Sequence, residues 1–299
     1  MPIIGRRTTA DLLLLLAALL WGSAFVPQRM IAPHLGFFLF NGLRFLLGAM
    51  ILLPWVRPRQ WPAKAALQWA SIGGCLLLVA AACQQAGMQF TTAGNAGFLT
   101  GLYVVLVPLV LLVGWRQKVA WRSWVAALTA AAGVFFLSVD NQFQLNSGDA
   151  LEIIGAVVWA LHVVVVGRAV AQVDVLLFSV GQYLVAGALN LVLGLTLQSH
   201  TLPALATCWW AVAYTGVFSI AAGYTLQAVG QKHAPAADAA IILSMEAVFA
   251  ALFGHLLLRE LFAGRQLVGC AMILGAVAIV QKYSESETVA EKPKPGVGS

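Results

Sequence analysis

Long apolar segments separated by short polar turns make up most of this chain. A helix needs about 20 apolar residues to cross the hydrocarbon core of a bilayer, which is roughly 30 Å thick. Hydrophobic residues form 61% of the sequence and charged residues only 9%, which is outside the range of soluble globular domains. The sequence therefore predicts an all-α integral membrane protein with ten transmembrane helices. The ten apolar runs lie at about 12–28, 35–56, 65–87, 92–114, 121–139, 150–169, 174–197, 207–229, 235–258 and 264–282.

Little of the chain remains for soluble domains. We expect residues 1–11 to form a short cytoplasmic N-terminus, and the polar, proline-rich residues 283–299 to form a disordered cytoplasmic tail. The net charge of +6 would suggest nucleic-acid binding in a soluble protein. In a membrane protein the basic residues are instead expected at the ends of spans, so we expect no nucleic-acid partner.

The distribution of basic residues predicts the orientation in the membrane. Of the 17 Lys and Arg residues, Arg44 lies inside a predicted span and Arg29, Arg259 and Arg265 lie on one side of the membrane. The other basic residues all lie on the side of the two termini. Because Lys and Arg concentrate in cytoplasmic segments, we expect both termini in the cytoplasm of a multi-pass protein of the bacterial inner membrane.

The chain contains a weak internal repeat. The stretch "DLLLLLAALLWG" from Asp11 returns as "DALEIIGAVVWA" from Asp149, and "FNGLRFLLGA" from Phe40 matches "FSVGQYLVAGA" from Phe178 at the same offset. The predicted repeats occupy residues 12–139 and 150–282. Since each unit has an odd number of spans, the second unit must be inverted in the membrane, as in many secondary transporters.

These motifs resemble those of the EamA family of the drug/metabolite transporter superfamily. The resemblance covers about residues 10 to 282 and includes "WGSAFV", "FNGLRFLLGA", "TTAGNAGFLTGLYVVLVPL", "WALHVV" and "YTLQAVGQKHAPAADAAIILSMEAVFAALFGHLLLRE". It implies a 5+5 inverted repeat, alternating access and, usually, export of small metabolites or amino acids. Where the family usually has Leu-Glu-Pro in span nine, this chain has Met245-Glu246-Ala247, so the proline kink beside the acid is missing.

Glu246 is the acid that residue count places deepest in a predicted span. It lies 11 residues after Pro235 and 13 before Arg259, which is close to the bilayer midplane at about 1.5 Å per residue. An ionised acid there costs several kcal/mol unless it is paired, protonated or facing water. It is therefore either a proton carrier or partner for a substrate amine, or a carboxyl that holds two helices together.

Arg44 in span two is the only strongly basic residue away from the ends of a predicted span, at a depth similar to that of Glu246. Two interpretations remain open. Arg44 pairs with Glu246 across the two halves and forms a gate, or it binds backbone carbonyl groups or extends toward the interface.

Polar and aromatic side chains also recur at helical spacing inside the predicted spans. Each alone is more often an interhelical hydrogen bond than a ligand, but together they indicate a polar interior suited to an amphipathic organic solute. His162 adds a possible proton relay, because its ordinary pKa is near 6.5. The further candidates for the substrate or proton pathway are Thr100, Tyr103, Trp159, His162, Gln182, Tyr224 and Gln227.

The function expected from these features is secondary active export of a small organic metabolite or amino acid, with proton coupling through Glu246 as one interpretation. The chain has no GxxxxGK[ST] loop for ATP. A membrane-embedded enzyme or sensor is the alternative, but no HExxH motif or paired intramembrane aspartates support it. We expect no cofactor, no metal and no obligate protein partner; the expected partners are a small-molecule solute and the lipid bilayer.

Overall fold

The computed structural model describes residues 5–57, 64–90, 98–138, 147–198, 202–258 and 264–290. Within these ranges the chain is helical and forms no strand, as expected where lipid offers the backbone no hydrogen-bond partner. The helices are α1 Arg6–Ile31, α2 Phe37–Leu52, η1 Leu53–Trp55, α3 Lys64–Gly87, α5 Tyr103–Trp115, α6 Trp121–Ser138, α7 Ser147–Ala169, α8 Val175–Leu197, α9 Leu202–Tyr214, η3 Thr215–Tyr224, α10 Thr225–Gln231, α11 Ala236–Leu243, α12 Met245–Leu258 and α13 Gly264–Ala290.

The predicted helical membrane fold is confirmed. Among the described residues, nine helices are long and apolar enough to cross a membrane, and Trp121–Leu137 is a shorter apolar helix at the position of the fifth predicted span. The count is therefore close to the ten spans predicted. α13 continues to Ala290, past the predicted end of the last span at Lys282, and the remainder of the predicted tail, 291–299, lies outside the described residues.

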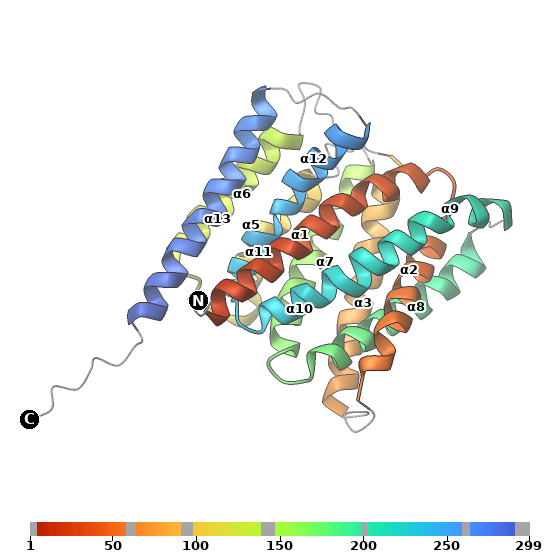
Figure 1. The fold of residues 1–299 in the computed structure, drawn as a ribbon, viewed down its shortest axis with the longest axis horizontal. Helices are drawn as coiled ribbons and strands as arrows, with labels where there is room; N and C mark the ends of the chain where they lie inside the picture. The colour runs from red at the N-terminus through yellow and green to blue at the C-terminus, as the bar shows by residue number, and fades with distance from the viewer. Residues whose placement is uncertain are drawn as a thin grey trace, which may run out of the picture.

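The helix contacts follow the internal repeat. If each helix is replaced by its equivalent in the other half of the chain, every contact named below becomes another observed contact or stays the same. α1 packs on α12 and α5 on α7; α2 packs on η3 and α3 on α8. Two further pairs, α2 with α8 and α6 with α13, join equivalent helices of the two halves. Figure 1 shows α6 and α13 side by side at one edge of the bundle, with α2, α3 and α8 toward the other. Such a pattern is what a pseudo-two-fold axis between two five-helix units produces.

Glycines bring the equivalent helices into close contact. A Cβ atom on Gly133 of α6 would lie 2.8 Å from the Gly269 carbonyl oxygen, and one on Gly269 of α13 would lie 2.5 Å from the Gly133 carbonyl oxygen. In α2 and α8, a Cβ on Gly42 would lie 2.6 Å from the Leu191 nitrogen. Small residues are the usual means of close helix association in lipid, where apolar side chains gain nothing by leaving the solvent.

Three spans lose regular α-helical geometry within their length, and the fourth span does so at Leu102. The eighth span changes from α9 to the π-helix η3 and then to α10, and π-helical turns are frequent at functional sites. The ninth is interrupted at Ser244, whose Oγ donates to the Ile241 carbonyl at 2.6 Å. The Ala247 nitrogen then donates to the Ser244 carbonyl, only three residues back. A serine hydroxyl bonded to its own helix commonly bends it, so the break arises beside Glu246 without a proline.

Candidate functional site

A small space, the central cavity, lies where α1, α2, α3, α5, α7, η3, α10, α11 and α12 meet. Its volume is about 40 Å³, enough for a few water molecules but far below the roughly 300–1,000 Å³ of typical ligand sites. Of the nine candidate residues chosen from the sequence, eight line this cavity. The central cavity is lined by Trp21, Phe25, Gln28, Arg44, Gln84, Thr100, Tyr103, Trp159, His162, Val163, Ser219, Tyr224, Gln227, Leu243 and Glu246.

Gln182 is the selected residue that does not line the central cavity. It lies on α8 behind His162, and its Oε1 is 3.0 Å from His162 Nε2. An amide oxygen accepts hydrogen bonds, so it is the Nε2–H tautomer of the imidazole that donates to Gln182. The other ring nitrogen, Nδ1, has no hydrogen-bond partner in any described segment. Gln182 therefore orients His162 rather than contacting a solute directly.

Tyr224 is the centre of an aromatic cluster along one wall of the central cavity. Its ring lies 4.7 Å from the Trp21 ring, 6.0 Å from the Trp159 ring in a stacked arrangement, and 5.9 Å from the His162 imidazole edge to face. Trp21 is fixed because its Nε1 donates to the Ser219 carbonyl of η3 at 3.1 Å. The rings offer large flat surfaces to an organic solute, and their electron-rich faces also attract cations.

Glu246 stands in the first turn of α12, directly after the break at Ser244, and is partly exposed toward the central cavity. The Tyr103 hydroxyl neighbours the carboxyl but forms no well-aligned hydrogen bond with it. On the backbone side, a Cβ on Gly22 of α1 would lie 2.8 Å from the Glu246 carbonyl oxygen. Close packing on α1 thus holds the backbone of Glu246 while the carboxyl stays available to the cavity.

Arg44 does not form the suggested gate with Glu246. The structure describes both residues, and the ion pairs seen within the described ranges join Arg7 to Asp11 and to Asp238. The Arg44 Nη1 donates to Gln28 Oε1 at 2.9 Å, and its Nε donates to Asn41 Oδ1 at 3.0 Å. These partners are side-chain amides and not the backbone carbonyl groups considered from the sequence. The guanidinium also lies 4.9 Å from the Phe40 ring centroid. Arg44 is therefore a fixed positive charge in the cavity wall.

Several polar atoms around the central cavity have no hydrogen-bond partner among the described residues. They are the Tyr103 hydroxyl, Trp159 Nε1, His162 Nδ1, and both Nε2 and Oε1 of Gln227. Buried polar groups are normally hydrogen-bonded, because an unmade bond costs about 1–3 kcal/mol. Water or a polar solute in the cavity can therefore form hydrogen bonds with these unpaired donors and acceptors.

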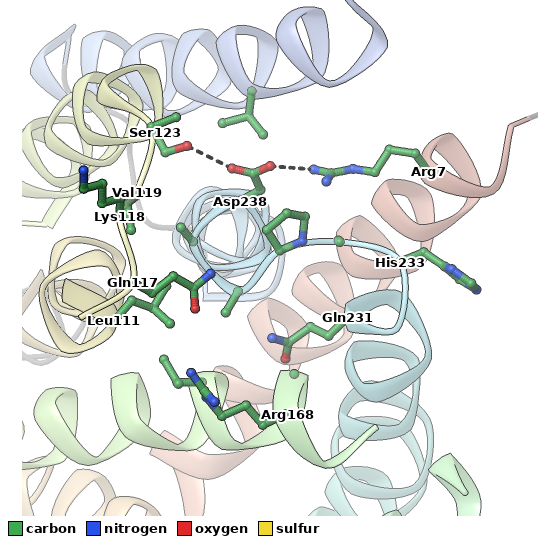
Figure 2. Close-up of a pocket in the computed structure, with 18 of the residues that line it drawn as sticks. Arg7, Leu111, Gln117, Lys118, Val119, Ser123, Arg168, Gln231, His233 and Asp238 are labelled. Atoms are coloured by element: carbon green, nitrogen blue, oxygen red, sulfur yellow. Dashed lines mark hydrogen bonds and ion pairs between the residues drawn. The ribbon is translucent and has the colours of Figure 1, made fainter. Parts of the chain in front are cut away.

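A second, larger space opens at the end of the bundle that carries Arg7, Lys118, Arg168 and Lys232, here called the basic end. This vestibule has a volume of about 1,030 Å³. Figure 2 shows Asp238 between Ser123 and Arg7 at its rim, with Asp238 bonded to Arg7 Nη2 at 3.0 Å and to Ser123 Oγ at 3.1 Å.

A thin layer of protein separates the vestibule from the central cavity. Gln231, which lines the vestibule, donates through Nε2 to the Val163 carbonyl at 2.9 Å, and Val163 lines the central cavity. Gln227, one helical turn before Gln231 on α10, also lines the central cavity. A path from the basic end to Glu246 would thus have to open between α7 and α10.

The sequence reasoning missed several polar residues at this site, among them Gln28, Gln84 and Glu152. Gln28 and Gln84 line the central cavity; Gln28 ends the first apolar run beside Arg29, and Gln84 stands beside Gln85 near the end of the third, which was a usable signal. Glu152 is fully buried and bonded to Thr100 at 2.8 Å, so Glu246 is not the only deeply buried acid. Residue count put Glu152 near the end of its span and gave no sign that neighbouring helices cover it.

Comparisons with known proteins agree with this architecture. The EamA-like transporter family matches residues 8–139 and again residues 146–281. An uncharacterized transporter of Archaeoglobus fulgidus is 29% identical over 92% of this chain and 86% of its own length, and the uncharacterized transporter YetK of Bacillus subtilis is 23% identical over 98% and 90%. A solved crystal structure with 20% identity superposes with a TM-score of 0.78, covering 94% of this chain and 99% of that one.

Proposed function

Because the chain belongs to the EamA-like transporter family, we propose that it is a secondary active transporter that exports a small organic metabolite or amino acid in exchange for protons. The observation that carries this proposal is the set of unpartnered polar atoms on the wall of the central cavity, next to the aromatic cluster and Glu246. A solute with a flat apolar part and a polar or charged group fits such a wall.

The size of the central cavity supports alternating access. At about 40 Å³ it cannot hold even a small amino acid, whereas the vestibule at the basic end has ample room. The solute therefore requires the two halves to move apart. The interruptions at η3 and Ser244 lie at the cavity wall, where a change of helix geometry would enlarge it.

Glu246 is the group we assign to coupling. A carboxyl in this position without a basic partner is less costly when it holds a proton, and a cationic solute group or access to water would allow it to release that proton. The solute and the proton would then compete for one carboxyl. Such competition makes inward proton movement drive outward solute movement.

The proposal places the basic end in the cytoplasm of a bacterial cell, with the protein in the inner membrane and both termini inside. The support is the excess of Lys and Arg on the side of the termini. With this orientation the vestibule collects solute from the cytoplasm.

Efflux from proteoliposomes tests the proposal. Vesicles are loaded with a mixture of amino acids, amines and other small metabolites, and efflux is followed by mass spectrometry with and without an imposed pH gradient. We expect one solute class to leave faster when protons enter, and Glu246→Gln to lose this response. Asp174→Asn is the matched control, because Asp174 is an exposed helix cap on α8. An unchanged pH response in Glu246→Gln would contradict the coupling role, and the absence of efflux of any solute would contradict export of this class.

A further inference from the structure

Glu152 is a buried carboxyl that the proposed mechanism does not yet use. It lies on α7 near the end opposite the basic end, and its side chain has no exposed surface. Its Oε2 accepts a hydrogen bond from Thr100 Oγ1 at 2.8 Å, whereas Oε1 has no partner in the part of the chain that the structure describes. A Cβ on Gly87 of α3 would lie 2.7 Å from Oε1, so the carboxyl occupies space that a glycine leaves free.

No positive charge compensates Glu152 among the described residues. The titratable groups that face it are Cys83 on α3 and Asp149, one turn earlier on its own helix; Thr100 faces it from the α5 side. Neither of the ion pairs at the basic end involves Glu152. A buried carboxylate without a cation costs several kcal/mol, and proton binding removes that charge.

Hydrogen bonds connect Glu152 to the central cavity. Its partner Thr100 lines the cavity, as does Gln84, whose Nε2 contacts Thr100 Oγ1 at 3.5 Å. Tyr103, which neighbours Glu246, follows Thr100 by one helical turn, a rise of about 4.5 Å. The helix is interrupted at Leu102 between these two residues. One helix face thus places a hydroxyl beside each of the two acids.

We infer that Glu152 is a second proton-binding carboxyl of the transport path, positioned between the central cavity and the end of the bundle opposite the basic end. The inference rests on the proposed proton-coupled export. Glu152 takes up a proton from water at that end. Glu152 then releases this proton to water in the central cavity, or to the Thr100 hydroxyl while that hydroxyl gives up its own proton. In either case the Glu246 carboxylate receives the proton that the water or the hydroxyl releases. Each transfer breaks one O–H bond and forms another.

Infrared difference spectroscopy of the purified protein in lipid vesicles tests this site without a solute. In sodium-free buffer, we expect pH steps to change two protonated-carboxyl bands, one absent from Glu152→Gln and the other from Glu246→Gln. Asp174→Asn should leave both bands in place. Thr100→Val keeps the Glu152 carboxyl but removes its donor, and should move its band to higher frequency. A native spectrum without a band that depends on Glu152, or a band that changes with sodium rather than with pH, would overturn the inference.

Efflux measurements separate this inference from the proposed function. Proteoliposomes are loaded with the mixture used above, and the pH on the side opposite the basic end is lowered. If acid stimulates native efflux at least tenfold, we expect less than twofold stimulation in Glu152→Gln and an unchanged ratio in Asp174→Asn. Equal stimulation of native protein and Glu152→Gln would overturn the role of Glu152 and leave the proposed function intact. No stimulation of the native protein would overturn both.

Discussion

The contact between α6 and α13 predicts a specific loss of stability when Gly269 is replaced by alanine. The new Cβ would lie 2.5 Å from the Gly133 carbonyl oxygen and 2.6 Å from the Leu137 nitrogen. Non-bonded carbon atoms prefer about 3.5–4.0 Å, so α13 must move away from α6 by about 1 Å. Overpacking of this kind costs about 1–3 kcal/mol, which lowers the ratio of folded to unfolded protein roughly 5- to 140-fold.

Gly275→Ala is the matched control, because Gly275 lies on the same helix and a Cβ there would meet no atom within 4 Å. Alanine in an open helical position stabilises by about 0.5–1 kcal/mol relative to glycine. Thermal unfolding in detergent should therefore give a lower melting temperature for Gly269→Ala and an equal or higher one for Gly275→Ala. Equal melting temperatures for the two variants would refute the close contact between α6 and α13.

Three further predictions concern the two cavities. Arg44→Lys loses the planar group that contacts both Gln28 and Asn41; we expect solute efflux to fall at least tenfold while size-exclusion chromatography still shows folded protein. Trp159→Phe removes an indole N–H that has no partner within the described ranges; thermal stability should not fall, whereas the apparent KM for the exported solute should rise about fivefold or more. Asp238→Asn breaks the ion pair with Arg7, worth about 1 kcal/mol or less; its melting temperature should lie slightly below the native value in low salt and match it in 1 M salt.

Much of the fold follows from the sequence because the bilayer restricts the options. Apolar runs of sufficient length must form helices, and the return of the Asp11 stretch at Asp149 indicated two related halves. The break in the ninth span was harder to foresee. The absence of proline at position 247 suggested an unkinked helix. The structure instead interrupts the helix at Ser244, whose hydroxyl bonds to a carbonyl of its own helix.

The site could be predicted only as far as helical spacing reveals it. Thr100 and Tyr103 share one helix face, and so do Trp159 and His162, which is why these residues were selected together. Contacts between helices are a different matter. Gln28 on α1 contacts Arg44 on α2, and the burial of Glu152 depends on its covering by α3 and by the Thr100 segment. Such contacts arise from tertiary packing, which the spacing within one helix does not encode.

Carbodiimide labelling of Glu246 tests the central claim, that this carboxyl binds protons in the solute cavity. Carbodiimides react with protonated carboxyl groups in apolar surroundings, and mass spectrometry of the digested protein measures the modified fraction at each acid. The account predicts labelling of Glu246 that decreases as the pH rises and decreases at least severalfold when the solute identified by efflux is added at saturating concentration. Labelling of Glu246 that is unaffected by both pH and solute would contradict the account.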